Sequence, residues 1–404
     1  MVQGPVDRPG RVRRPRRRVG RPGEQGGRPL TAVAGQRRPA LPALTGLRVL
    51  AAVWVVLFHY RDDVEALLPW LAPADTLLRA GYLGVDLFFP LSGFILAYNY
   101  ADTMRRFSRG SSVSFVRNRF ARVWPVHFVA LNIDLVTAAL VGTLGIGENG
   151  HRRTAGAYVE NVFLVHNWWH DRPSFNGPAW SIGSEWFAYL TAPLLFVLLA
   201  RVVRARTALA GAALSYAAML AVFAAFALPN GNLEHMFYVR IMGEFVGGAF
   251  LCLAWVRGGL RLARLAPWLL VVPVVLALVP AASAGDYWAA PALGLVVAVV
   301  ASSQGLLARW LSTPWMVLAG EASYCLYMTH YLLRGVVSAL REWGQGAWWS
   351  AGLAVVAIAL VLAAAAWGMH VLVERPARRL LHARTPRPAT TATDTVTPHE
   401  RTPA

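Results

Sequence analysis

Apolar segments of nearly membrane-spanning length recur along this chain and constrain its fold more than any other feature. About ten of them occupy residues 43–60, 82–100, 123–146, 178–200, 208–228, 237–256, 267–282, 289–307, 315–339 and 347–373. A helix of about 20 apolar residues crosses the hydrocarbon core of a bilayer and satisfies its own backbone hydrogen bonds there. The pattern therefore predicts an all-α, polytopic integral membrane protein with about ten transmembrane helices.

Composition and charge support a lipid environment. Of the 404 residues, 56% are hydrophobic and only 15% are charged, which excludes an ordinary soluble protein. The net charge of +18 lies in a terminal arm and in short connections, as membrane topology requires, and does not indicate nucleic acid as a partner. Cys252 and Cys325 both fall inside apolar segments, so neither a disulfide framework nor a metal site is expected.

The distribution of arginine predicts the orientation in the membrane. Arginines are abundant in the connections after the even-numbered segments, whereas the connections 229–236 and 283–288 have none. Positively charged connections remain on the cytoplasmic side. We therefore expect a multi-pass protein of the plasma membrane with both termini in the cytoplasm. The exceptions are Arg152, Arg153 and Arg172, in the longest external stretch.

The chain divides into one membrane domain and two terminal arms. Residues 1–40 are rich in Arg, Pro and Gly and predict a disordered basic cytoplasmic arm, and residues 383–404 predict a disordered tail. The first apolar segment lacks a cleavage pattern, so we expect it to stay as a membrane anchor. Residues 41–382 are the expected membrane domain.

Five ionisable residues fall inside the predicted spans, where such groups usually face a cavity or a partner. They are His59, Asp86, Glu185, Glu244 and His330. Arg48 and His59 are eleven residues apart on one predicted helix, which is three turns, so they share a face at an axial offset of roughly 16 Å. The pair could grip an anionic ligand and present a base. The alternative is a snorkelling arginine and a hydrogen-bonded core histidine.

Two further stretches leave alternatives open. Ser181 and Glu185 form an i, i+4 pair after the turn at 176–178, on the side of the membrane expected for His59, where a carboxylate could orient an imidazole. For Asp86, a bond to an arginine or a backbone amide is as reasonable as catalysis. The external stretch 147–177 is either an interfacial segment or a substrate contact. It contains three histidines and two tryptophans, which are His151, His166, His170, Trp168 and Trp169.

Six motifs in a fixed order resemble those of the membrane-bound acyltransferase type 3 family, which acylates sugars, polysaccharides and natural products. They occupy residues 44–59 (an Arg, ten residues, then His), 84–94, 115–125, 178–185, 322–330 and 373–376. Two positions depart from the family pattern. Thr45 replaces the usual Asp, and Pro90 interrupts a phenylalanine-rich run.

The resemblance implies an enzyme that moves an acyl group, acetyl or another short chain, from acyl-CoA to a hydroxyl of a sugar, glycan or macrolide-type product. His59 would be the base, and Glu185 would orient it or contact the acceptor. Acyl-CoA is a co-substrate, and no bound cofactor or metal is expected. The remaining implied residues are Arg48, Arg119 and Arg122 on the donor, with Asp86, Trp180, Ser181, Tyr327 and His330 in support.

Two other classes of protein compete with this interpretation. A proton-coupled transporter could use the same ionisable residues, but its halves should show an internal repeat, and the sequence contains none that we can identify. A structural or sensor protein that presents the external stretch would leave the shared face of Arg48 and His59 unexplained.

Overall fold

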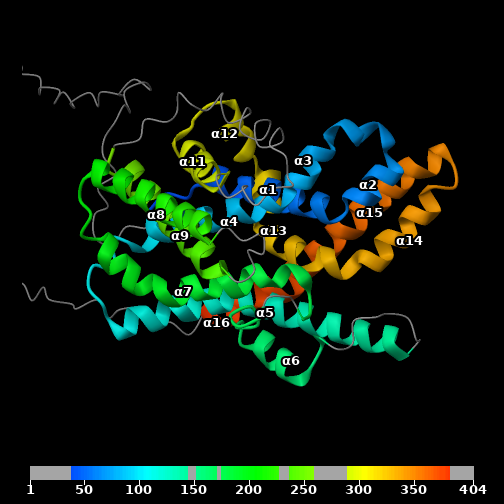
Figure 1. Cartoon of the computed structure of the whole chain (residues 1–404), viewed down its shortest axis with the longest axis horizontal. Coiled ribbons are helices and arrows are strands. Elements are labelled where there is room, and N and C mark those ends of the chain that lie inside the picture. The colour runs from blue at the N-terminus through cyan, green and yellow to red at the C-terminus, as the bar shows by residue number, and fades with distance from the viewer. Residues whose placement is uncertain (1–37, 144–151, 171–173, 227–235, 259–288, 383–404) are drawn as a thin grey trace, which may run out of the picture.

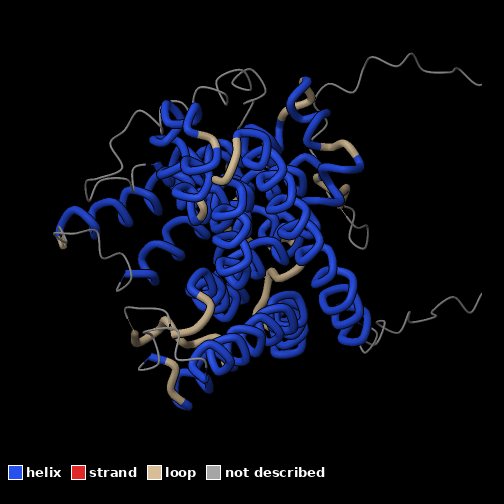
Figure 2. The backbone as a smooth tube through the Cα atoms, turned by 90° about the vertical axis from the view of Figure 1, so that its right-hand side faces the viewer, coloured by secondary structure: helices blue, strands red, loops and turns tan. Residues whose placement is uncertain are grey.

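The computed structural model of the protein describes residues 38–143, 152–170, 174–226, 236–258 and 289–382. These residues form helices joined by loops, and no strand occurs among them (Figure 2). The all-α fold is thereby confirmed. The long helices are α1 (Pro42–His59), α4 (Gly84–Tyr100), α5 (Arg109–Thr143), α7 (Trp180–Leu199), α8 (Ala205–Ala225), α9 (Phe237–Val256), α11 (Ala289–Ser302), α13 (Pro314–Thr329) and α15 (Trp348–Met369).

Seven helical stretches of the described residues are long and apolar enough to cross a membrane. They are Pro42–His59, Pro69–Tyr100, Arg109–Val141, Gly177–Leu199, Ala205–Ala225, Phe237–Val256 and Trp349–Leu381. The chain is therefore a polytopic membrane protein. The expected segment 267–282 lies outside the described residues, and the segment 289–307 contains the shorter apolar helix α11. The total of ten remains a prediction, as does the orientation.

The expected span at 315–339 is not one continuous helix. α13 ends at Thr329 and is followed by the 3-10 helix η8 (His330–Leu333) and then by α14 (Arg334–Gly344). α14 carries charged residues and packs against α2 (Arg61–Leu67) and α15. The apolar run is long enough for a span, but the apolar helix α13 ends where the helix type changes at His330.

Two helix pairs form the centre of the molecule (Figure 1). α4 packs on α9, and α1 packs on α13. Glycines permit the close approach of α4 and α9, because a Cβ at Gly93 would lie 1.9 Å from the carbonyl oxygen of Phe245 and one at Gly248 would lie 2.1 Å from that of Pro90. α4 continues through Pro90 without a break.

The remaining short elements lie at the ends of the long helices. α2, η1 (Pro69–Ala74), α3 (Asp75–Arg79) and η2 (Ala80–Leu83) connect α1 to α4. α6 (Ala155–Val162) and η4 (Gly177–Ala179) precede α7, α12 (Leu306–Leu311) precedes α13, and the π-helical turn η9 (His370–Glu374) leads into α16 (Arg375–His382).

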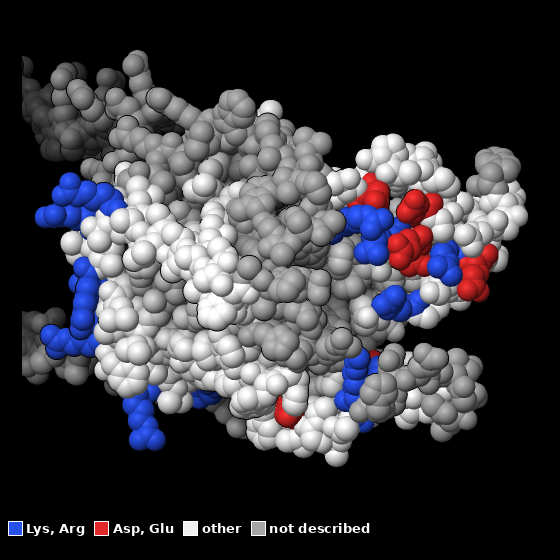
Figure 3. Space-filling model, in the orientation of Figure 1, with Lys and Arg blue, Asp and Glu red and all other residues white. Residues whose placement is uncertain are grey.

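Charge gathers at the two ends of the long axis (Figure 3). On the face shown, the described side chains at one end are basic and those at the other end carry both signs, and few described side chains between them are charged. This distribution suits a molecule whose long axis crosses the bilayer, because apolar side chains face the hydrocarbon.

Candidate active site

A small cavity lies among α1, α4, α5, α7 and α13. Its volume is about 80 Å³. Its walls combine apolar side chains from α4, such as Phe88, Phe89 and Ile95, with polar and charged groups from all five helices. The polar lining consists of Arg48, Ser92, Arg119, Ser181, Glu185, Tyr324 and Tyr327.

The two arginines on this cavity have no ion-pair partner among the described residues. The Nε of Arg48 donates to the Ser323 hydroxyl at 3.4 Å, and its guanidinium lies 5.9 Å from the centre of the Phe88 ring. The Nε of Arg119 is buried and has no hydrogen bond in this part of the chain. Both guanidinium groups therefore keep N–H donors available to an anionic ligand.

Glu185 faces the same cavity but is held by hydroxyl groups. One of its carboxylate oxygens accepts from Ser92 at 2.6 Å and from the hydroxyl of Tyr189, one turn further along α7. No hydrogen bond joins Glu185 to His59 within the described ranges. The side chain is placed on the cavity, where a ligand could reach it, and not beside the imidazole.

His59 is paired with a second histidine. Its Nδ1 lies 2.9 Å from the carbonyl oxygen of Val55 and 3.3 Å from the Nε2 of His330. The Nδ1 of His330 lies 3.2 Å from the carbonyl oxygen of Leu326. The packing of α1 on α13 brings the two rings to a centroid distance of 5.0 Å.

Tyr327 connects the cavity to this histidine pair. Its hydroxyl shares a 2.8 Å hydrogen bond with Ser181, and both side chains line the cavity. On its other side the Tyr327 ring lies 5.9 Å from the ring of His330. The predicted residues Arg48, Arg119, Ser181, Glu185 and Tyr327 therefore share one cavity, with the histidine pair next to it.

Asp86 is bonded to an arginine, which is one of the alternatives that the sequence left open. Arg240 donates to both of its carboxylate oxygens, at 2.7 and 2.5 Å, and the same guanidinium lies over the ring of Trp180 at 5.3 Å. Glu244 is buried 3.7 Å from Arg240, and its oxygens have no hydrogen bond among the described residues. Neither Asp86 nor Trp180 lines the cavity. No local pattern in the sequence identifies Arg240, which lies 154 residues from its partner.

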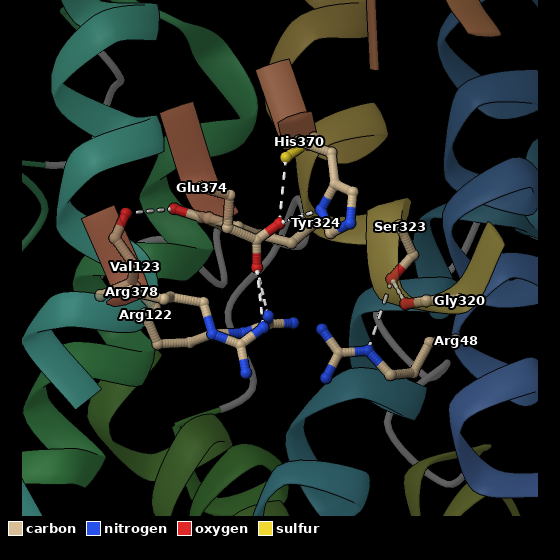
Figure 4. Close-up of polar contacts among 10 residues, drawn as sticks. Arg48, Arg122, Val123, Gly320, Ser323, Tyr324, His370, Glu374 and Arg378 are labelled. Atoms are coloured by element: carbon tan, nitrogen blue, oxygen red, sulfur yellow. Dashed lines mark hydrogen bonds and ion pairs between the residues drawn. The ribbon is translucent and has the colours of Figure 1, made fainter. Parts of the chain in front are cut away.

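Arg122 does not line the cavity, because Glu374 holds it (Figure 4). One oxygen of Glu374 accepts from Arg122 and lies 3.7 Å from Arg378. The other accepts from His370 at 2.7 Å and from the thiol of Cys325 at 3.3 Å. We call these five residues the Glu374 cluster. The expected role of Arg122 on the donor stays a prediction that this geometry does not support.

Three members of the Glu374 cluster have the chemistry of metal ligands. The ligand atoms of Cys325, His370 and Glu374 lie within 4.8 Å of one another. Thiolate, imidazole and carboxylate together suit zinc. Here, however, the thiol and the imidazole N–H both donate to the carboxylate, and two arginines supply the positive charge. The hydrogen-bond network therefore accounts for the thiol, the carboxylate and the Nδ1 of His370, whereas the Nε2 of His370 is buried without a partner among the described residues.

The external stretch is partly packed into the protein. His166 is 5% exposed, donates to the carbonyl of Ala179 at 3.1 Å and stacks on His127. Burial lowers the pKa of His166 to about 3, and the neighbouring His127 adds to the shift. Trp168 donates to the carbonyl of Gly183 at 3.1 Å, whereas Trp169 is exposed. His151 lies outside the described residues.

A helical membrane protein that gathers carboxylate and guanidinium groups on one cavity, with an imidazole pair against the tyrosine in its wall, has the organisation of a membrane-embedded enzyme. The model of an acyltransferase domain, acyltransferase type 3, matches residues 41–368. The chain belongs to this family and is an acyltransferase.

Curated relatives agree with this assignment. Acyltransferase MdmB from Streptomyces mycarofaciens is 28% identical over 392 residues, covering 88% of this chain and 96% of the relative. The O-acetyltransferase OatA from Staphylococcus aureus (strain NCTC 8325 / PS 47) is 22% identical over 334 residues, covering 76% of this chain and 52% of the relative. No solved structure matches the chain.

Proposed function

We propose that the protein moves a short acyl group from acyl-CoA to a hydroxyl of a sugar, glycan or macrolide-type product. One observation carries this proposal. The partly buried imidazole of His59 contacts His330, whose ring contacts Tyr327 in the wall of a cavity that holds two arginines without ion-pair partners among the described residues. Transfer to oxygen is further supported by the relative that is named an O-acetyltransferase.

The donor would bind through Arg48 and Arg119. Arginine matches phosphate groups in a two-pronged manner, and coenzyme A carries several phosphates. Arg48 lies near the start of α1, and the arginine distribution predicts that this end is cytoplasmic, where acyl-CoA is available. The cavity volume of about 80 Å³ holds several water molecules and suits a small acyl group better than a long chain.

The chemistry would be a direct transfer with His59 as general base. The hydroxyl proton of the acceptor passes to the imidazole while the oxygen forms a bond to the thioester carbonyl carbon. The carbon–sulfur bond then breaks, and the proton passes from the imidazolium to the thiolate of coenzyme A. A neutral imidazole suits this role because its ordinary titration range lies near neutral pH.

Cavity hydroxyls would assist this step. Ser181, Glu185 and Tyr327 line the cavity, and the hydroxyls of Ser181 and Tyr327 bond to each other and to the carbonyl oxygen of Pro178. A hydroxyl that turns from Pro178 to the thioester oxygen would stabilise the negative charge that develops there. We assign acceptor contact to Glu185, since its bonds run to Ser92 and Tyr189 and not to His59.

Purified protein in lipid nanodiscs, incubated with radiolabelled acetyl-CoA and a panel of glycosides and macrolides, tests the proposal. We expect a labelled ester that mild alkali releases and that the His59→Ala variant does not form. If labelled amides form, or if label passes only to acceptors without a hydroxyl, the proposed acceptor class is wrong.

A further inference from the structure

The hydrogen-bond pattern around His59 and His330 determines where the protons sit. Each Nδ1 lies close to a carbonyl oxygen four residues earlier in its own helix, Val55 for His59 and Leu326 for His330. A carbonyl oxygen only accepts hydrogen bonds, so a nitrogen at such a distance must carry a proton. In neutral rings, each Nδ1 is therefore protonated and each Nε2 holds a lone pair.

The contact between the two rings agrees with this assignment. The Nε2 of His330 lies 3.3 Å from the Nδ1 of His59, so a lone pair meets an N–H group. If His330 were protonated on Nε2 instead, its Nδ1 would direct a lone pair at the Leu326 oxygen, and the Nδ1 of His59 would do the same at the Val55 oxygen. Only one arrangement of the neutral pair satisfies all three contacts, with the single Nδ1–H of His59 shared between the Val55 oxygen and the Nε2 of His330.

We propose that His330 is a positioning residue that holds His59 in the Nδ1-protonated form, so that the Nε2 of His59 is the basic atom. This inference rests on the proposed function, in which His59 is the base. No hydrogen bond reaches the Nε2 of His59 among the described residues, so its lone pair is available to a hydroxyl. His330 thereby orients the imidazole of His59, a role that the sequence suggested for Glu185.

His330 is itself firmly held, which a positioning residue requires. Its side chain is fully buried, and its backbone carbonyl accepts a hydrogen bond from the hydroxyl of Tyr60, the residue after His59. When the Nε2 of His59 takes up a proton, the Nδ1–H becomes a stronger donor. The lone pair of His330 and the Val55 carbonyl then both stabilise the imidazolium.

Two substitutions separate positioning from packing. Gln places its amide at the level of the imidazole Nε2, so His330→Gln can still offer an oxygen to the Nδ1–H of His59. Asn places its amide at the level of Nδ1, so His330→Asn can bond to Leu326 but cannot reach His59. We expect His330→Asn to lower kcat by about 10- to 100-fold with an unchanged KM for acyl-CoA, and His330→Gln to keep about a third of wild-type kcat.

A second measurement reads the tautomer without relying on activity. In protein labelled with ¹⁵N-histidine and embedded in bilayers, the His59 signals are identified by their loss in the His59→Gln variant. We expect a protonated Nδ1 and an unprotonated Nε2 in the wild type, and a smaller fraction of this form in His330→Asn, where only the Val55 carbonyl still accepts from the Nδ1–H. An Nε2-protonated His59 in the wild type would overturn the proposal, even if His330→Asn fails to fold.

The outcomes distinguish the inference from the proposed function. If His59→Gln is inactive while His330→Asn and His330→Gln are equally impaired, His330 is a packing residue and His59 remains the base. If His59→Gln retains more than about a tenth of wild-type turnover, the general-base role itself is wrong. The NMR signals then decide the tautomer alone.

Discussion

Two neighbouring groups of buried charge differ in how completely they are paired. In the Glu374 cluster, one carboxylate accepts from Arg122, His370 and Cys325 and lies beside Arg378. In the cavity, Arg48 and Arg119 have no carboxylate partner among the described residues (Figure 4 shows Arg48 beside the cluster). Since an uncompensated buried charge is costly, the first group is complete by itself, whereas the second leaves donors for the anionic ligand that we propose.

Two arginines of the same basic motif belong to different groups, one to the cavity and the other to the Glu374 cluster. Arg119 and Arg122 are three residues apart on α5, which turns them about 60° from each other around the helix axis. That angle places Arg119 on the cavity and Arg122 against Glu374. Proximity in a motif therefore does not imply a shared role.

The largest expected effect is the loss of stability on opening the Glu374 cluster. Glu374→Ala leaves Arg122 buried without its carboxylate, which costs about 3–5 kcal/mol of unfolding free energy. Thermal unfolding in detergent measures the loss, with Glu185→Ala as the control from the cavity. A wild-type melting temperature for Glu374→Ala would show that the cluster does not hold the fold.

Replacing Arg48 or Arg119 should weaken binding of the donor more than it lowers the stability of the fold. Arg48→Ala or Arg119→Ala removes charged hydrogen bonds to the donor worth about 1.5–3 kcal/mol each, so the KM for acyl-CoA should rise roughly 10- to 100-fold. Arg122→Ala should chiefly lower the melting temperature. A larger rise in the donor KM for Arg122→Ala than for Arg119→Ala would reverse our assignment of the two.

The buried imidazole of His166 adds a third case to the comparison, a group that stays uncharged in the folded protein. Its pKa of about 3 in the folded protein lies below the ordinary value of 6.5, because burial disfavours the charged ring. The unfolded chain then binds more protons, so this stability is present above pH 6.5 and is lost as the pH falls toward 3, at about 1.4 kcal/mol per pH unit.

The His166→Gln variant tests this pH dependence. Its amide can still donate to Ala179 but does not titrate. Between pH 7 and pH 5 the variant should lose less thermal stability than the wild type. An identical loss in both proteins would show that His166 is not the titrating group.

The smallest expected effect concerns Ser92, one of two hydroxyls that hold Glu185. Ser92→Ala leaves the bond from Tyr189 in place, so the cost is about 0.5–1.5 kcal/mol, or roughly a 2- to 10-fold lower kcat/KM for the acceptor. Initial rates at varied acceptor concentration measure it. A selective change in the donor KM would place Glu185 on the donor instead.

Local features of the sequence predicted much of the fold. The apolar runs predicted α1, α4, α7, α8, α9 and α15, because span length depends only on the bilayer. The i, i+4 spacing of Ser181 and Glu185 correctly indicated that both face one site. The sequence also required a partner for Asp86, although it could not say which.

Contacts between distant helices could not be predicted in this way. His59 meets His330 across 271 residues, and Arg122 meets Glu374 across 252. Such pairs depend on which helices pack together, and a single sequence does not contain that information in any local pattern. For the same reason, the sequence left open whether Glu185 orients His59 or contacts the acceptor.

The turnover of the His59→Gln variant tests the central claim most directly. Gln keeps the volume and a hydrogen-bonding edge but cannot take up and release a proton. With amounts of folded protein matched, acyl transfer from acyl-CoA to the acceptor should fall by about 100- to 10,000-fold, as expected for a lost general base. Retention of more than about a tenth of wild-type turnover would contradict the account and make Glu185 the next candidate for the base.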